Sequence, residues 1–535
     1  MGPAARSPLI APRRVGEAVV VVLVALALAG GLVLLGDPDL RGDQNAYNLL
    51  VAKKLSPGLL ARDALYRYDP DLLHVPWFLD AQAALARRLG GDVERALAWL
   101  GWLMGALFIV GHYVFFRVVS GRVLAAALAT LGALTLRNAL GGEVWGFDGL
   151  PSAATRTILA GLTPLLLLLF LWWRARPALA GYWALLGVLF NVHPVSAYQL
   201  AQVTALAHLW RERCRPRALV QVALGVALFV VAALPYLVPF FGGREGGGAP
   251  ATVRAALDYR FPYLLYPIAP NALLSVAFHM ALPLAAWLAW RRRREANSAL
   301  TPLQPVMGAA IALGFGGTAL IQAVGVALDR PYADIQQLRI LRLLYPILLG
   351  GLALTYARWL DRRTAAARAA VVALLLLSLV PPAEVIHAVS WETRAAVKHA
   401  LGMGPAPAAA VAADTAARPA LWRWATTTPP SALFMTDDGE FRLRTRRSIT
   451  GSWKDGALMF LAGSGPLTQW YALDRERAAC RATGASACWF ELGRRLDADF
   501  VIVDPGLGRV AAPPPADFAR VWEQGAWSVW RRAGR

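Results

Sequence analysis

Long apolar runs alternate with short polar segments from the amino end of the chain to about residue 382. An α-helix needs about 20 predominantly apolar residues to cross a hydrocarbon core about 30 Å thick. The runs fall near residues 17–35, 97–116, 122–136, 158–173, 179–192, 195–210, 218–241, 270–290, 303–327, 338–357 and 366–382. This pattern predicts a polytopic α-helical membrane protein, with about 11 transmembrane helices in residues 1–382.

Basic segments separate these runs in pairs, so the helices are expected to form hairpins. The basic segments are Arg13/Arg14, Arg117/Arg122, Arg174/Arg176, residues 211–217, residues 291–295 and residues 358–368. Lys and Arg concentrate in the cytoplasmic loops of membrane proteins. The alternation therefore predicts a cytoplasmic amino terminus and an external carboxyl terminus. The segments expected outside the membrane are residues 36–96, 137–157, 242–269, 328–337 and 383–535.

One part of this pattern requires a broken helix. Basic segments flank residues 179–210 on both sides, so a single crossing would place one basic flank outside. Two short crossings, separated at Asn191-Val192-His193-Pro194, agree better with the charge rule. Because each would have only about 15 residues, a re-entrant or tilted pair is an alternative.

An acidic stretch directly follows the first run, in the sequence GDPDLRGDQNAYNLLVAKKLSPGLL of residues 36–60. Asp37, Asp39 and Asp43 lie where the first helix would emerge into water. Asp43 is either a general base or metal-binding carboxylate, or simply the cap of the following helix. All three could hold a divalent cation such as Mg²⁺ or Mn²⁺, which prefers oxygen ligands. Asp37 and Asp39 are equally typical of an ordinary helix exit.

Two short helices are expected in the same external segment. Residues 44–55 carry Tyr47 and other apolar residues at helical spacing, which suits a helix that lies along the membrane interface. A second helix is predicted over residues 76–89, where Gly90-Gly91 would end it. Asp92 would then cap the helix that leads into the second span.

The composition changes near residue 383, from apolar runs to mixed polar segments with alternating patterns. Helices are expected over residues 394–410 and 421–428. The strand-like segments are residues 432–435, 448–450, 500–503 and 527–530. Residues 383–535 are therefore predicted to form a small, soluble α/β domain outside the membrane. If this domain faces an oxidising compartment, Cys480 and Cys488 can form a disulfide.

The overall composition agrees with a membrane location. Hydrophobic residues make up 57% of the chain and charged residues 16%, and the mean hydropathy is +0.45. Average globular domains carry about 25% charged residues. The net charge of +20 arises largely from arginines in short loops, so it favours the lipid bilayer as partner and no nucleic acid.

Three basic residues near the external ends of spans are candidates for binding an anion. His193 lies in the expected helix break, and an ionisable residue at membrane depth suggests function. It could equally donate a hydrogen bond to a neighbouring carbonyl. Arg339 and Arg342 lie one turn apart where the tenth span begins. Arginine binds phosphate oxygens well, although each could also extend to the interface only for solvation.

Two further segments have both a functional and a structural interpretation. Glu143 and Asp148 stand beside glycines and aromatic residues in the segment 137–157. They suit a loop that stacks on a sugar or faces lipid, and equally a turn with an aromatic belt. Residues 442–454, RLRTRRSITGSWK, form a basic patch. It could approach anionic lipids, but a solvated face is the preferred interpretation.

The chain resembles the GT-C superfamily of membrane glycosyltransferases, especially bacterial members with a carboxyl-terminal periplasmic domain. The matching segments are Gly42-Asp43 with AYNLLVAKKLSPGLLARDALY after the first span, and TTPPSALFMT with FRLRTRRSITGSWKD in the last domain. The resemblance covers the layout of the whole chain, but its motifs are short. It implies a bacterial inner-membrane enzyme with a polyprenyl-phosphate-linked sugar as donor. The peptide-binding signature of oligosaccharyltransferases is absent, so protein N-glycosylation is not expected.

The same resemblance implies a mechanism and a set of site residues. The acid of the first external loop maps onto Asp43, which would act as the general base of an inverting transfer to an extracytoplasmic glycan, lipid or protein. The substrate-binding residues would be Tyr47, Glu143, Asp148, His193, Arg339 and Arg342. The irregular spacing of the three aspartates leaves metal dependence open.

Two other classes of function stay open. A transporter or flippase for lipid-linked saccharides would also have many spans and buried charges, although such proteins often contain internal repeats. A non-catalytic protein of envelope assembly would not need an acid at Asp43.

Overall fold

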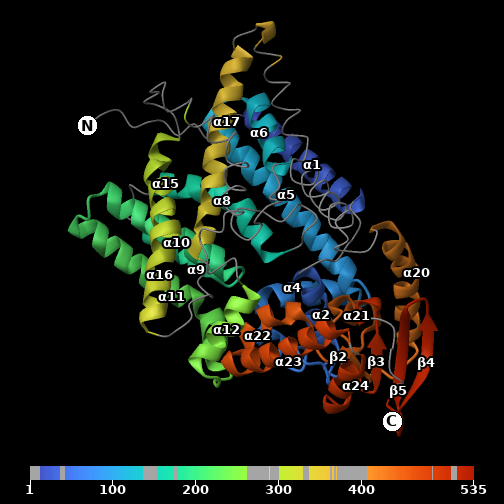
Figure 1. The fold of residues 1–535 in the computed structure, drawn as a ribbon. Helices are drawn as coiled ribbons and strands as arrows, with labels where there is room; N and C mark the ends of the chain where they lie inside the picture. Colours follow the sequence, from blue (N-terminus) through green and yellow to red (C-terminus); the bar gives the residue numbers. More distant parts are fainter. Residues whose placement is uncertain are drawn as a thin grey trace, which may run out of the picture.

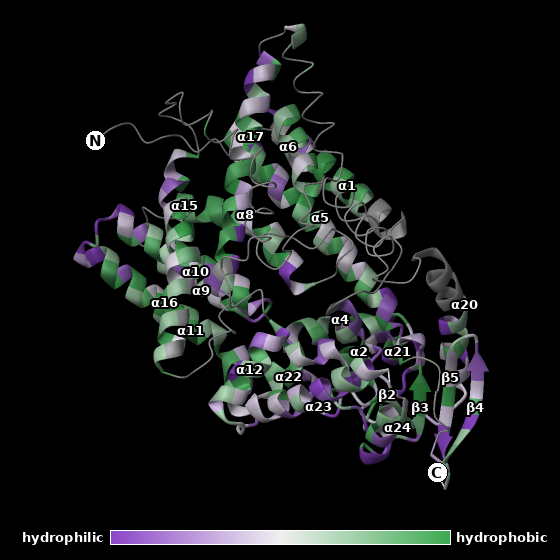
Figure 2. Ribbon diagram, in the orientation of Figure 1, coloured by the Kyte–Doolittle hydropathy of each residue, from purple (hydrophilic) through white to green (hydrophobic). Residues whose placement is uncertain are grey.

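The computed structural model describes residues 12–35, 43–135, 154–173, 179–261, 288, 300–328, 337–361, 364–366, 369, 407–484, 486–507 and 515–534. Elongated helices form the upper part of the molecule in Figure 1, and shorter helices with a small sheet form the lower part. Apolar residues dominate the upper helices, whereas polar residues are frequent in the lower part (Figure 2). We call the lower part the external layer, after the side that the charge pattern predicts.

The upper part is a bundle of helices that follow the apolar runs. They are α1 (Pro12–Leu35), α5 (Val93–Ser120), α6 (Val123–Thr135), α8 (Thr155–Trp173), α9 (Leu179–Phe190), α10 (Pro194–Arg211), α11 (Pro216–Gly242), η1 (Thr301–Leu303), α15 (Gln304–Ile311), η2 (Ala312–Gly317), α16 (Thr318–Ala327), η4 (Gln337–Leu343) and α17 (Leu344–Asp361). Among the described residues, five helices are long and apolar enough to cross a membrane. Membrane-like helices are thus confirmed, while the predicted runs at 270–290 and 366–382 lie almost entirely outside the described residues.

Both helices predicted in the segment 36–96 are present, as α2 (Asp43–Leu55) and α4 (Pro76–Arg88). A further short helix, α3 (Pro70–Leu73), was not predicted. Gly90 and Gly91 follow α4 with φ of 73° and 90°, a conformation that glycine adopts without strain. The Asp92 side chain accepts a hydrogen bond from the Arg95 N–H at 2.9 Å, so it caps α5 as predicted.

The last domain combines a five-stranded sheet with helices. Its helices are α20 (Pro407–Thr426), α21 (Gly439–Thr445), η5 (Trp453–Asp455), α22 (Gly456–Ala462), α23 (Ser464–Thr483), α24 (Ser486–Arg495) and η6 (Pro505–Leu507). Its strands are β1 (Leu433–Met435), β2 (Ser448–Ile449), β3 (Phe500–Val503), β4 (Phe518–Gln524) and β5 (Trp527–Arg532). The order is β2-β1-β3-β5-β4, with β1 parallel to β2 and β3, and β5 antiparallel to β3 and β4.

The sequence located four of these strands and missed one. It did not predict β4, and it gave a short helix over 421–428 where α20 extends from Pro407 to Thr426. Much of the predicted helix at 394–410 lies outside the described residues. Cys480 and Cys488, whose pairing the sequence left open, form a disulfide that links α23 to α24. Helix α12 (Pro250–Arg260), which follows α11 in the chain, packs beside α23.

A buried ion network joins the first external segment to the last domain. Arg442 on α21 donates from Nε to Asp63 at 2.7 Å and from both Nη atoms to Asp455 at 2.6 and 2.7 Å. Asp63 also accepts N–H groups from Leu65, Tyr66 and Ile449 at 2.9 to 3.1 Å. These contacts place residues 43–92 and the last domain on the same side of the bundle, and the charge pattern likewise assigns them to one side.

The pKa values of the two carboxylates in this network shift in opposite directions. Burial alone raises the pKa of Asp455, but the charge of Arg442 and hydrogen bonds from Arg442 and Ser452 outweigh it, so this pKa lies below its usual range. For Asp63 burial dominates and raises the pKa, despite the nearby Arg442. The network is therefore centred on the ionised pair Arg442–Asp455.

The interpretation of residues 442–454 as a solvated basic face is wrong for Arg442 and Arg447, which are both buried. Arg442 is 2% exposed and Arg447 is 8% exposed. Arg447 donates to the carbonyl oxygen of Thr426, at 2.7 Å, and to the Thr428 hydroxyl, at 3.2 Å. A guanidinium at the end of α20 satisfies carbonyls that the helix leaves without partners. Charge spacing alone does not reveal such acceptors.

Replacing Arg442 by Leu should weaken the attachment of the first external segment. The change leaves Asp63 and Asp455 buried without their cation, and breaking a buried ion pair in this way costs about 3–5 kcal/mol. Amide hydrogen exchange of the full chain in detergent should accelerate in the peptides that contain Leu65, Tyr66 and Ile449. The matched control is Arg494→Gln, which removes an ion pair with Asp517 at the surface. Equal exchange in Arg442→Leu and the control would contradict the assigned role.

Candidate functional site

Four basic side chains from separate segments lie within range of electrostatic interaction where the helical bundle adjoins the external layer. Arg156 is the second residue of α8, and His193 precedes α10. Arg342 lies on η4, just before α17, and His74 follows α3. We call these four residues the cation cluster. Each stands at or next to a helix end, which is where a bundle can direct polar groups out of the apolar interior.

The predicted helix break is what places His193. Helix α9 ends at Phe190 and α10 begins at Pro194, whose ring is compatible with a first helical turn. The Asn191 amide donates to the carbonyl of Gly187 on α9, at 3.1 Å, and to that of Ala232 on α11, at 2.8 Å. The break is therefore held in place by hydrogen bonds to two helices.

Hydrogen bonding also defines the chemical state in which His193 can act. Its Nδ1 accepts the N–H of Ser196 at 3.2 Å and so caps α10. Because Nδ1 is an acceptor in this contact, neutral His193 carries its proton on Nε2. The ring can then donate one hydrogen bond from Nε2.

Electrostatic interactions connect the members of the cation cluster. The charges of Arg156 and Arg342 and the imidazole of His74 all act on His193, and Arg156 acts on Arg342. Guanidinium groups bind carboxylate or phosphate oxygens through charge-assisted hydrogen bonds, so Arg156 and Arg342 are suited to binding an oxyanion here.

An aromatic wall adjoins the cluster on the side of the external layer. The Tyr47 ring of α2 stacks on His74 with ring centroids 4.3 Å apart and planes at 16°. Phe78 of α4 meets Tyr47 edge-on at 5.5 Å. Tyr47 and Phe78 are both buried. The wall fixes the orientation of the His74 imidazole, whose position follows from α3.

A glycine-rich turn of π-helix positions the segment that carries Arg342. A Cβ atom at Gly314 of η2 would lie 2.7 Å from the Cδ2 of Leu341, and one at Gly317 would lie 3.2 Å from the Cγ of Gln337. Only glycine allows η4 to approach η2 so closely. Gln337 also donates to Gln202 of α10 at 3.1 Å, so η4 is tied to the helix that follows His193.

The structure brings together three of the residues that the sequence suggested, namely Tyr47, His193 and Arg342. Arg339 lies on the same 3₁₀ helix and is half-buried. Asp43 is the first residue of α2, one turn before Tyr47, and its side chain lies outside the described residues. The same holds for the whole of Asp37, Asp39, Glu143 and Asp148.

Two members of the cation cluster were not selected from the sequence. His74 lies between apolar residues, Leu72 and Leu73 before it and Val75 after it, with no spacing that suggests a site. Arg156 belongs to the segment 137–157, which the sequence predicts to be a loop, whereas it stands in the first turn of α8. A basic residue at the start of an external-to-internal span is the one signal that could have singled it out.

In the part of the chain that the structure describes, no three His, Cys, Asp or Glu side chains gather in a way that could hold a metal ion. The three candidate ligands Asp37, Asp39 and Asp43 are not in this set.

Comparison with models of known protein families gives no match, and comparison with curated proteins gives none either.

Replacing Gly314 by Leu should displace η4. The added side chain would collide with Leu341, and overpacking of this kind costs about 1–3 kcal/mol. Hydrogen exchange in residues 337–343 should become faster. Gly316→Leu is the matched control, since a Cβ there meets nothing within 4 Å. If both variants exchange at the same rate, close packing on η2 does not hold Arg342.

Proposed function

We propose that the chain is an inverting membrane glycosyltransferase, which moves a sugar from a polyprenyl-phosphate-linked donor to an extracytoplasmic acceptor. The acceptor class is a glycan, a lipid or a protein. The observation that carries the proposal is the cation cluster, gathered beside aromatic side chains at the junction of apolar helices and a polar layer. A lipid-linked phosphate sugar matches this junction, because its apolar tail can lie among the helices while its anionic head lies at the polar layer.

The cation cluster supports binding of the donor phosphate. Arg342 and Arg156 would donate hydrogen bonds to phosphate oxygens, and His193 would donate from Nε2. These groups stabilise the negative charge that grows on the phosphate as it leaves. Tyr47, Arg339 and the loop residues Glu143 and Asp148 are proposed to contact the sugar or the phosphate around this centre.

Asp43 is proposed as the general base. The acceptor oxygen forms a bond to the anomeric carbon, while the bond from that carbon to the phosphate oxygen breaks. The proton of the acceptor hydroxyl passes to the Asp43 carboxylate, and the electron pair of the broken bond leaves with polyprenyl phosphate. Attack opposite the leaving group inverts the anomeric configuration. The position of Asp43, one turn before Tyr47 on α2, supports its role as the base.

A divalent cation, Mg²⁺ or Mn²⁺, is a further part of the proposal. Asp37, Asp39 and Asp43 would hold it through carboxylate oxygens, and it would supply positive charge to the phosphate. No step above is routed through the metal ion.

The proposed location is the bacterial inner membrane, with 11 spans, a cytoplasmic amino terminus and an extracytoplasmic last domain. The disulfide between Cys480 and Cys488 supports an oxidising compartment for that domain. Exposed tryptophans also lie near both ends of the bundle, as in the aromatic belts of membrane proteins. They are Trp99 near the start of α5, Trp172 at the end of α8 and Trp210 at the end of α10.

Asp43→Asn should abolish most of the transfer. A general base contributes about 10²–10⁴-fold in rate, and the amide cannot take the proton. The measurement is release of polyprenyl phosphate from a panel of lipid-linked sugars by the purified chain. Full activity of Asp43→Asn would remove the proposed base. Normal lipid flipping without transfer by the unaltered chain would favour a transporter instead.

Arg342→Gln should act on binding of the donor. A hydrogen bond to a charged group is worth about 1.5–3 kcal/mol, which corresponds to a rise of about 10- to 150-fold in the KM for the lipid-linked sugar. Arg87→Gln, at an exposed position of α4, removes the same charge from the external layer and should leave KM within two-fold of the unaltered chain. Equal changes in both variants would show that Arg342 has no specific contact with the donor.

A further inference from the structure

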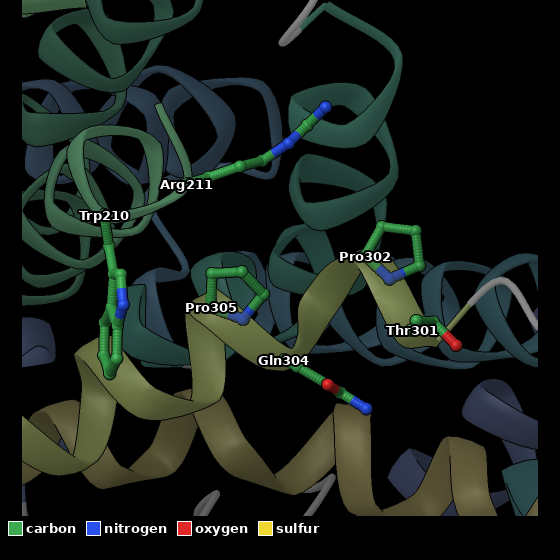
Figure 3. A pocket seen from close by; sticks show the side chains of 6 residues that line it. All are labelled: Trp210, Arg211, Thr301, Pro302, Gln304 and Pro305. Atoms are coloured by element: carbon green, nitrogen blue, oxygen red, sulfur yellow. The ribbon is translucent and has the colours of Figure 1, made fainter. Parts of the chain in front are cut away.

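A second basic site lies at the opposite end of α10 from His193. A cavity of about 480 Å³ opens there, between the last turn of α10 and the first turns of α15. Its lining residues are Trp210, Arg211, Thr301, Pro302, Gln304 and Pro305 (Figure 3). The candidate spans that contain α15 and α11 both begin close to it in the sequence, at Thr301 and Pro216. The cavity therefore lies where apolar helices give way to polar turns.

Close packing between α10 and α15 shapes one wall of this cavity. A Cβ atom at Gly308 would lie 2.8 Å from the Cζ3 of Trp210, so the indole needs a glycine on α15. Figure 3 shows Trp210 and Arg211 leaving the end of α10 in different directions, with Pro305 between them in this view. The 59% exposure of Trp210 fits a residue that sits at the level of lipid headgroups.

The turn that follows α10 is strongly basic. Residues 211–217, RERCRPR, carry four arginines and one glutamate, and all four arginines are exposed. Arg211 is the one that lines the cavity. Basic groups at the end of membrane helices attract anionic lipids, at about 1 kcal/mol for each Lys or Arg near the surface.

An apolar surface begins directly beside this basic turn. Leu219 and Val220, in the first turn of α11, are 49% and 66% exposed, and exposed aliphatic side chains continue along the helix. His208 of α10 makes a hydrogen bond to Gln221 of α11 at 3.1 Å, which holds the start of α11 against the end of α10. A molecule with an anionic head and apolar chains would match both surfaces at once.

We propose that this cavity binds the headgroup of an anionic phospholipid. The phosphate lies against the Arg211 guanidinium, the Trp210 indole packs on the glycerol region, and the acyl chains follow α11 into the bilayer. The basic turn 211–217 favours an anionic ligand over a neutral one. The apolar surface of α11 beside it favours a lipid over a soluble phosphate. The site is separate from the cation cluster, because α10 lies between them.

The test is native mass spectrometry of the full chain in detergent, with phosphatidylglycerol or phosphatidylcholine as the added lipid. We expect the chain to retain phosphatidylglycerol preferentially. Arg211→Gln should lower that affinity about five-fold. The matched control is Arg217→Gln, which removes the same charge from the same turn outside the cavity, and it should change the affinity less than two-fold.

A second variant tests the cavity without a change of charge. Gly308→Leu should push the Trp210 indole into the headgroup space and weaken phosphatidylglycerol binding. If Gly308→Leu unfolds in detergent, Trp210→Ala is the variant to use, and it should weaken binding as well. Equal losses in Arg211→Gln and Arg217→Gln would overturn the proposal in favour of general charge attraction. Equal binding of the two lipids, or unchanged binding in the variants that alter the cavity wall, would also overturn it.

Discussion

The structure depends on how one guanidinium, that of Arg442, is buried between two carboxylates. Removing three charged groups from water is costly, and the cost is offset only when every group finds hydrogen-bond partners. That condition is met here, since each carboxylate oxygen of Asp63 and Asp455 accepts two hydrogen bonds. Asp63 belongs to the first external segment and Asp455 to the last domain. The network therefore joins parts of the chain that are almost 400 residues apart, as the Arg442–Asp63 separation of 379 shows.

This attachment has a direct consequence for the candidate site. The turn that contains Asp63 lies between α2, which carries Tyr47, and α3, which precedes His74. Apolar packing extends the attachment, because Tyr47 and Phe78 share one buried cluster with Leu443 and Met459 of the last domain. The last domain thus holds α2, α3 and α4 in place over the ends of α8, α10 and η4. The last domain thus contributes to the site without supplying the cation cluster itself.

The sequence predicted the features that local physics controls. Helical periodicity, caps and glycines gave α2, α4 and the start of α5, and proline with asparagine gave the break before α10. Strand β4 was missed because its burial alternates poorly, with most of its residues exposed at the edge of the sheet. Arg442 was misjudged because its partners, Asp63 and Asp455, become neighbours only in the folded chain. The grouping of His74 and Arg156 with His193 depends on tertiary structure in the same way.

The central claim is that the cation cluster holds the phosphate of a lipid-linked substrate. The most direct measurement is an electron cryomicroscopy structure of the chain with polyprenyl phosphate bound in a nanodisc. The account predicts phosphate density within hydrogen-bonding distance of the Arg342 guanidinium and the His193 Nε2, with the lipid tail leading into the helical bundle. Phosphate density elsewhere on the chain, with Arg342 and His193 away from it, would contradict the account.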